Sequence, residues 1–283
     1  MGQGKSRIGI TIGVEIGENS LASDRPGRLE NILEETGGLA VAFSGGCDST
    51  FLAAVAAQVL GERALAITVL SPIHPEREQK GAASLAASIG IRQAVTEAHQ
   101  MAHPEFTANP PDRCYHCKTL IFGHMRDLAG QHGFAAVSGT NASDTGDYRP
   151  GLQAETTIGI RRPLLDAGLT KADIRAIARA MDLPCAEAPS MACLASRVPY
   201  GQAITTEILA RIDRCEQALR AMGFSQLRVR DHDTLARVEV PPAEIPLAIE
   251  RRGEIVAILT QAGYAYATLD MKGYRTGAMN EVL

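Results

Sequence analysis

A short apolar run leading into a serine- and glycine-rich loop constrains this chain more than any other feature. Leu39-Ala-Val-Ala-Phe43 has the length and composition of a buried strand, and the stretch from Ser49 to Leu60 has those of a helix. The loop between them, Ser44-Gly-Gly-Cys-Asp-Ser49, supplies the tight turn that joins the two. This segment therefore predicts a strand, a loop and a helix in direct succession.

The alternation of strand and helix continues along the chain. Residues 65–70 form a second predicted strand, residues 76–89 a second helix and residues 135–138 a further strand. Thr170-Lys-Ala-Asp173 is a capping box, which predicts that another helix begins there. Such units predict an α/β fold in which helices cover both faces of a parallel sheet. Ligands of these sheets bind beyond the carboxyl ends of the strands, where the loop after Phe43 is expected.

The residues of this loop suit the binding of phosphate. Gly45 and Gly46 allow the backbone N–H groups to approach an anion closely, and the following helix N-terminus adds partial positive charge. Ser44 and Ser49 can donate hydroxyl hydrogen bonds to phosphate oxygens, while Asp48 can orient the loop or hold Mg²⁺. Ser-Gly-Gly alone is common in ordinary turns, but the full pattern between an apolar strand and a helix favours a phosphate site.

Cys114-Tyr-His-Cys117 is the second strong signal, because two cysteines at this spacing can bind one metal centre or form a redox pair. The pair alone leaves zinc, a disulfide and an iron–sulfur cluster open. Cys193 is the expected third partner. Three thiolates on a [4Fe–4S] cluster would leave one iron open to sulfide or substrate, whereas structural zinc needs a fourth protein ligand. His116, between the two cysteines, is badly placed for that role.

The surroundings of the cysteines add further expectations. Arg113 and Lys118 flank the pair and are expected to lower the thiol pKa values. Cys47, inside the phosphate loop, is interpreted as a small hydrophobic residue that supports the loop. Cys215 falls on the apolar face of a predicted helix and is assigned to the core, and Cys185 is assigned a structural role in a loop.

Three regions are expected along the chain: an N-terminal extension over residues 1–30, the phosphate-loop domain over 31–199 and a smaller α+β domain over 200–283. In the last region a helix is followed by half-exposed strands, a proline-led helix and a final strand. Arg228 and Arg230 alternate onto one face of the first of these strands. They could bind a phosphate or carboxylate of a substrate. A solvated strand face is the competing interpretation.

Composition narrows the classes of partner. The 283 residues carry a formal net charge of −4, so no overall positive field recruits nucleic acid or an anionic membrane. No apolar run has the length of a membrane span, and the N-terminus lacks the layout of a secretory signal. Six cysteines are too few for a disulfide scaffold, which favours a reducing cytoplasm. The expected partner is a small molecule.

Two levels of resemblance follow from these motifs. The loop from Ser44 to Ser49 resembles the PP-loop of enzymes that cleave ATP to AMP and pyrophosphate, whose fold is of the adenine nucleotide alpha hydrolase type. Longer matches are similar to the LarE-type enzymes of nickel-pincer nucleotide synthesis. They are Asp112-Arg-Cys-Tyr-x-Cys-Lys118, Gly139-Thr-Asn-Ala-Ser-Asp144 with Gly146 to Gly151, Ala192-Cys-Leu-Ala-Ser-Arg197 with Pro199-Tyr-Gly201, and Leu269-Asp270 with Gly273-Tyr-Arg-x-Gly277.

The resemblance implies a sulfur transferase that acts on pyridinium-3,5-biscarboxylic acid mononucleotide. ATP with Mg²⁺ would adenylate a carboxylate, pyrophosphate would leave, and sulfur held by the protein would produce a thiocarboxylate. One branch of the family sacrifices a single cysteine, and Cys193 stands at that position. Another branch carries three cysteines and is thought to hold a [4Fe–4S] cluster. Cys114 and Cys117 match the additional pair, so the cluster is the favoured sulfur carrier.

The resemblance also implies roles for individual residues. Thr140 and Asn141 are expected at the ATP site, beside the residues of the PP-loop. The expected substrate-binding residues lie near the sulfur site and in the C-terminal region: Ser196, Arg197, Glu216, Arg228 and Arg230. A homo-oligomer is expected as well, because the C-terminal helices carry apolar residues that can serve assembly.

Three competing functions share parts of this pattern. A tRNA thiolase can also combine a PP-loop with three cysteines, but the near balance of acidic and basic residues in the C-terminal region argues against it. An amide ligase fed by ammonia would leave both cysteine motifs without a role. A non-catalytic nucleotide sensor would bind ATP without releasing pyrophosphate.

Overall fold

The computed structural model describes residues 25–146, 150–188, 192–275 and 277–282. Most of the expected N-terminal extension lies outside these residues. Four parallel strands form the first sheet in the order β3-β2-β1-β4, and three strands form a second sheet in the order β5-β6-β7. The strands are β1 (Leu39–Ala42), β2 (Ala64–Leu70), β3 (Arg92–Glu97), β4 (Ala135–Val137), β5 (Arg228–His232), β6 (Leu235–Glu239) and β7 (Tyr266–Leu269).

Eleven helices lie within the described residues. They are α1 (Arg25–Glu35), α2 (Cys47–Leu60), α3 (Glu76–Ser88), α4 (Pro104–Thr107), α5 (Arg113–Gln131), α6 (Pro150–Ile158), α7 (Pro163–Asp166), α8 (Lys171–Ala180), α9 (Thr206–Ala221), α10 (Ile245–Glu250) and α11 (Arg252–Gln261). Short 3₁₀ turns connect several of them. None of the described helices has the length and apolar character needed to cross a membrane.

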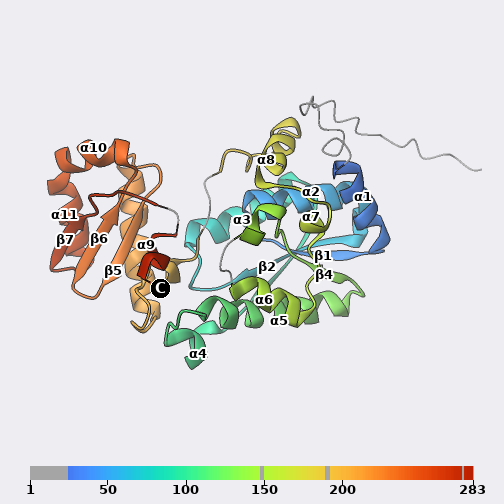
Figure 1. The fold of residues 1–283 in the computed structure, drawn as a ribbon, viewed down its shortest axis with the longest axis horizontal. Coiled ribbons are helices and arrows are strands. Elements are labelled where there is room, and N and C mark those ends of the chain that lie inside the picture. The colour runs from blue at the N-terminus through green and yellow to red at the C-terminus, as the bar shows by residue number, and fades with distance from the viewer. Residues whose placement is uncertain (1–24, 147–149, 189–191, 276, 283) are drawn as a thin grey trace, which may run out of the picture.

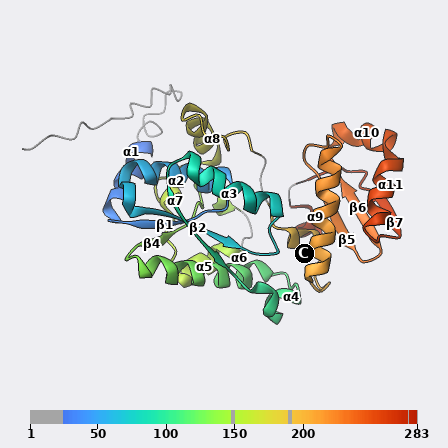
Figure 2. The ribbon, with the colours of Figure 1, turned by 180° about the vertical axis from the view of Figure 1, so that it is seen from behind.

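Helices cover both faces of the first sheet, which confirms the predicted α/β architecture (Figure 1). Side chains alternate between faces along a strand. Leu39 and Val41 therefore join a core with α1, α2, α3 and α8, whereas Ala40 faces α5 through Phe122 and Met125. The view from behind shows α5 and α6 together on the second face (Figure 2).

A local signal explains where helix α8 begins. Thr170 accepts a hydrogen bond from the backbone N–H of Asp173, and the Asp173 side chain accepts one from the N–H of Thr170. The predicted capping box is therefore present at the start of α8. Helix α1 begins at Arg25, and its Leu29 and Leu33 belong to the domain core. The boundary expected at residue 30 consequently falls inside a helix that packs with the PP-loop domain.

The C-terminal region has its own small core. Strands β5 and β6 pair antiparallel, β7 adds parallel to β6, and α9 and α11 pack on this sheet. Leu219, Val229, Val238 and Leu259 are buried between them. A separate apolar cluster joins this region to the first domain, and it includes Ile73, Phe106, Cys117, Leu194, Val198, Ile204, Leu209 and Ile212. The site residues of both regions thus share a packed junction.

Candidate active site

The loop after β1 is held in shape by its own serines. The Ser44 hydroxyl lies 3.1 Å from the Ser49 hydroxyl and accepts a hydrogen bond from the backbone N–H of Gly46 at 3.2 Å. Ser49 in turn donates to the carbonyl oxygen of Gly46 at 3.1 Å. Because these contacts fix the backbone at the N-terminus of α2, the loop presents a preformed anion-binding turn.

Two glycines make this geometry possible. Gly45 has a φ of 78°, which side-chain-bearing residues adopt only with strain. Gly139 follows β4 and lies against the first turn of α2. A Cβ atom at that position would stand 3.0 Å from the backbone nitrogen of Ser49 and 3.2 Å from the carbonyl carbon of Asp48. The glycine of the Gly139-Thr-Asn motif therefore brings the end of β4 into contact with the PP-loop.

A cavity of about 340 Å³ opens beside the loop. The PP-loop contributes Ser44, Gly46, Cys47, Asp48 and Ser49 to its lining. Three cationic side chains also line it: Lys118, Lys171 and Arg175. Backbone amides, hydroxyls and three cations around one cavity suit the triphosphate of a nucleotide. The sequence indicated Lys171 only as part of the capping box that begins α8, and it assigned neither Lys171 nor Arg175 to phosphate.

Glu155 on α6 organises one wall of this cavity. Its buried carboxylate accepts hydrogen bonds from the Thr140 hydroxyl at 2.9 and 3.0 Å and lies 3.4 Å from the ammonium nitrogen of Lys118. Thr140 lines the cavity as expected, but its hydroxyl is occupied by Glu155. Asn141 is not among the described lining residues. Asn141 is buried, and its side-chain oxygen accepts a hydrogen bond from the backbone N–H of Ser143. This bond stabilises the loop that follows β4.

A second cavity joins the loop to Cys193. Its volume is about 220 Å³, and Ser44 of the PP-loop and Cys193 both line it, together with Lys118 and the ends of β1 and β2. Cys193 stands directly before a short 3₁₀ turn at Leu194–Arg197. One continuous site can therefore hold an activated group close to both the phosphates and a sulfur atom.

Cys114 and Cys117 lie one helical turn apart at the start of α5, and Cys117 is buried in the apolar cluster against which Cys193 packs. Arg113 and Lys118 act on the thiol pKa values in the expected direction, but burial outweighs them, so the net shift is upward. Burial and the neighbouring Cys193 raise the pKa of both Cys114 and Cys117, while Arg113 and Lys118 lower that of Cys114 and Lys118 lowers that of Cys117. Arg113 also stacks on the Tyr200 ring at 4.6 Å.

Cys114, Cys117 and Cys193 are the three thiols that the sequence singled out as candidate ligands. Among the described residues, no three His, Cys, Asp or Glu side chains gather around one point as the ligands of one ion do. Gln100 is buried and points its side-chain nitrogen at the sulfur of Cys117, 4.0 Å away. Hydrogen bonds of this kind stabilise a sulfur that carries negative charge.

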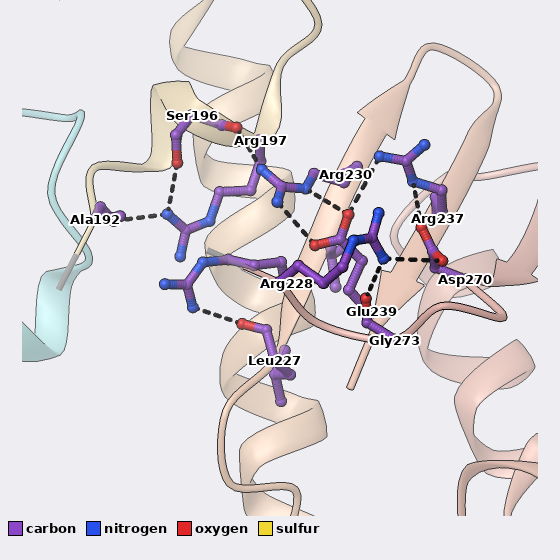
Figure 3. Close-up of polar contacts among 12 residues, drawn as sticks. Ala192, Ser196, Arg197, Leu227, Arg228, Arg230, Arg237, Glu239, Asp270 and Gly273 are labelled. Carbon is purple, nitrogen blue, oxygen red and sulfur yellow. Dashed lines mark hydrogen bonds and ion pairs between the residues drawn. The ribbon is translucent and has the colours of Figure 1, made fainter. Parts of the chain in front are cut away.

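Arginines and glutamates dominate the junction with the C-terminal region (Figure 3). Arg197 forms a bidentate pair with Glu216 at 2.9 and 3.0 Å, and Arg220 adds a further contact at 2.7 Å. Glu216 is fully buried, and these arginines hold the pKa of its carboxyl at about 2 against the effect of burial. Glu216 therefore reaches no ligand directly, and the substrate contact expected of it is revised to the positioning of two arginines.

Arg228 and Arg230 project from the same face of β5, as the alternation predicted. Of the two, Arg230 is already paired with a carboxylate of the protein. Arg230 forms a bidentate pair with Glu239 at 2.9 and 2.8 Å and donates to the carbonyl oxygen of Ser196 at 2.7 Å. Its guanidinium is buried and held by Glu239 and Ser196, which revises its expected role from substrate binding to support. Ser196 also turns inward, because its hydroxyl donates to the carbonyl oxygen of Cys193 at 2.8 Å.

Arg228 lacks a carboxylate partner among the described residues. It donates to the carbonyl oxygen of Leu227 at 2.8 Å and lies 5.1 Å from the Tyr274 ring centre. Burial and the charge of nearby Arg197 lower the pKa of Arg228 to about 10. It lines a third cavity of about 360 Å³ with Arg77, Arg197 and Arg220. An anion bound in this cavity would supply the missing countercharge.

The remaining cysteines lie in cores. Cys47 and Cys185 are both buried in the main core of the first domain, and Cys215 is buried in the core of the C-terminal region. Cys185 places its sulfur 4.0 Å from the carbonyl oxygen of Cys47. The structural roles expected for Cys47 and Cys215 are confirmed by these positions. Cys185 packs closer to the PP-loop than the sequence indicated.

Comparison with known proteins supports the same assignment. The family described as NAD synthase matches residues 28–108, which span the PP-loop and strands β1 to β3. An uncharacterised protein of Synechocystis sp. is 41% identical over 262 residues, covering 90% of this chain and 98% of that protein. The pyridinium-3,5-bisthiocarboxylic acid mononucleotide synthase of Lactiplantibacillus plantarum is 35% identical over 245 residues, covering 86% and 89% respectively.

An uncharacterised protein of Methanocaldococcus jannaschii is 27% identical over 253 residues and covers 88% of this chain. The parallel sheet, the PP-loop and its cavity define an ATP-dependent enzyme of the PP-loop class. Within that class the chain belongs to the LarE-type family of sulfur transferases, to which the relative from L. plantarum belongs. This membership favours the LarE-type enzyme over the amide ligase, the tRNA thiolase and the sensor.

Proposed function

We propose that this protein uses ATP to convert carboxylates of pyridinium-3,5-biscarboxylic acid mononucleotide into thiocarboxylates. The observation that carries the proposal is the cavity lined by both Ser44 and Cys193. It allows an acyl group activated at the PP-loop to meet a sulfur atom without leaving the site. The name of the L. plantarum relative supplies the substrate class, a pyridinium mononucleotide.

The first half of the reaction is adenylation. A carboxylate oxygen of the substrate attacks the α-phosphorus of ATP, and the bond to pyrophosphate breaks. Backbone N–H groups of Gly45 and Gly46, with the hydroxyls of Ser44 and Ser49, bind the departing pyrophosphate. Asp48 is assigned to Mg²⁺, which would offset the charge that develops on the phosphates. Lys118, placed by Glu155, reaches from the phosphate cavity toward the cavity of Cys193.

The second half delivers sulfur. A sulfur nucleophile attacks the acyl carbon, and AMP leaves with the former carboxylate oxygen. Cys114, Cys117 and Cys193 are the residues that would hold a [4Fe–4S] cluster, and such a cluster would offer an open iron to carry sulfide. The apolar cluster around Cys117 keeps water from the acyl adenylate, which would otherwise hydrolyse. Without a cluster, Cys193 alone would serve as the sacrificial sulfur source.

The two sulfur sources differ in a measurable way. A cluster predicts about four irons per chain after anaerobic reconstitution and loss of multiple turnovers in Cys114→Ala. Cys215→Ala is the matched control, because that thiol is buried in another core and should leave the iron content unchanged. Iron near zero in the reconstituted wild type, or repeated turnovers by Cys114→Ala, would exclude the cluster.

Arg228 is assigned to the phosphate of the substrate. Replacement by alanine is expected to raise the KM for the mononucleotide at least tenfold, since a charged hydrogen-bonding partner is lost, while the KM for ATP stays unchanged. Arg214→Ala serves as the control, because Arg214 is exposed on α9 and lies outside the cavity. Equal effects of Arg228→Ala on both substrates would place the arginine elsewhere in the site.

Self-association is part of the proposal. Several large apolar side chains of the C-terminal region are exposed, including Ile249, Val256, Tyr266 and Met271. Patches of this kind commonly bind another protein surface. Sedimentation of the purified protein is expected to give a mass above that of one chain, and a monomer at micromolar concentration would refute this part.

A further inference from the structure

Glu78 lines three of the cavities in and around the site. It belongs to the first turn of α3 and lines the cavity of Ser44 and Cys193, the arginine-lined cavity of Arg228 and a third one beside Gly45. In each of the three, it is the acidic residue among the described lining residues. A carboxylate that lines all three cavities can contact a ligand that extends from the PP-loop site to the arginines.

The carboxylate of Glu78 is poorly satisfied by the protein. Its side chain is 16% exposed, and its ion-pair partner is the guanidinium of Arg77 at 3.8 Å, beyond hydrogen-bond distance. Burial raises the pKa of Glu78, while Arg77, Arg197 and other cations oppose that effect. A half-buried carboxylate that makes no close contact gains most from a cationic ligand.

Among the described residues of the arginine-lined cavity, the half-exposed Arg77 forms the one ion pair with Glu78, at 3.8 Å. Glu216 already pairs with both Arg197 and Arg220, and Arg228 remains for an anion. For a ligand that carried only phosphate and carboxylates, Glu78 would be a repulsive neighbour. A carboxylate beside an anion site is favourable when the ligand also carries a positive charge next to its anionic groups.

We infer that Glu78 is a specificity-determining residue that contacts the positively charged pyridinium ring of the substrate, while Arg228 binds its phosphate. The inference rests on the proposed function, since that function supplies a zwitterionic ligand. Glu78 would favour a ring that is cationic and reject neutral or purely anionic mononucleotides. The same contact would turn the ring's carboxylate toward the cavity that contains Ser44 and Cys193.

Binding by isothermal titration calorimetry separates this role from a structural one. The probes are nicotinic acid mononucleotide, which has a cationic ring, and ribose 5-phosphate, which has none. Glu78→Gln is expected to bind the pyridinium probe at least about fivefold more weakly and ribose 5-phosphate as tightly or more tightly than the wild type. Glu76→Gln, on the same turn of α3 but exposed, should change neither.

Failure of this inference can be distinguished from failure of the proposed function. Parallel changes for both probes in Glu78→Gln, or a change in the KM for ATP instead, would overturn the contact with the ring while leaving the proposed function intact. Absence of pyridinium binding by the wild type would overturn the proposed substrate and this inference together. Glu78→Asp keeps the charge and should retain a preference for the pyridinium probe, whereas loss of that preference in a folded Glu78→Asp would also contradict the inference.

Discussion

Replacing Glu216 by glutamine tests the charge network that places the arginines of the site. The carboxylate is fully buried and binds Arg197 at 2.9 and 3.0 Å, Arg220 at 2.7 Å and the backbone N–H of Val229 at 3.1 Å. Glutamine preserves the shape of the side chain but removes its charge. Two guanidiniums at the junction would then share an uncompensated positive charge away from water.

Two independent estimates give the size of the effect. Breaking a buried ion pair by removing one partner typically costs about 3–5 kcal/mol. The pKa of Glu216 falls from an ordinary 4.5 to about 2, which corresponds to roughly 3 kcal/mol of stabilisation. Because the folded-state pKa is the lower one, this stabilisation is fully present above pH 4.5 and is lost as pH falls toward 2.

Urea unfolding at pH 7, followed by circular dichroism, should therefore show that Glu216→Gln lowers the free energy of unfolding of the C-terminal region by about 3 kcal/mol. Glu250→Gln is the control, since Glu250 is exposed on α10. Between pH 4.5 and 2 the difference between wild type and Glu216→Gln should shrink. A loss below about 1 kcal/mol, or a difference that does not depend on pH, would refute the reasoning.

Three further substitutions probe other parts of the site and its support. Gly139→Ala would force the backbone of the PP-loop to move, because its Cβ stands 3.0 Å from the Ser49 nitrogen, and pyrophosphate release should fall at least about 100-fold. Wild-type rates would contradict that packing. Glu155→Gln removes the charge that places Lys118, and kcat/KM for ATP should drop about tenfold in a pyrophosphate assay; an effect confined to the mononucleotide would contradict it. Tyr264→Phe loses a 2.7 Å hydrogen bond to Asp231 and should lower stability by about 1–3 kcal/mol in a urea titration, with unchanged stability as the contrary result.

Much of the first domain follows from its sequence. The apolar runs at β1, β2 and β4 and the capping box of α8 identify buried strands and a helix start through local signals. Strand β3 was missed because Arg92–Glu97 is an edge strand with exposed and half-buried side chains, so it lacks an apolar run. Pairing with β2 rather than its own composition places it in the sheet.

The contacts among the candidate site residues could not be predicted from the sequence. The resemblance implied that Glu216, Arg228 and Arg230 belong near the substrate. The residues that pair with them are separated from them along the chain, so the sequence did not reveal those pairs. Only the fold shows that Glu239 pairs with Arg230 while Arg228 has no described carboxylate partner. Glu78 carried no motif at all, and it becomes notable because it lines three cavities.

The most direct test of the central assignment is the product of one anaerobic reaction. The reconstituted protein is incubated with ATP, Mg²⁺ and pyridinium-3,5-biscarboxylic acid mononucleotide, and the nucleotides are analysed by mass spectrometry. The assignment predicts AMP, pyrophosphate and a substrate mass that rises by the exchange of one oxygen for one sulfur, with all three absent in Ser49→Ala. AMP and pyrophosphate formed without any sulfur in the mononucleotide, or no cleavage of ATP, would contradict it.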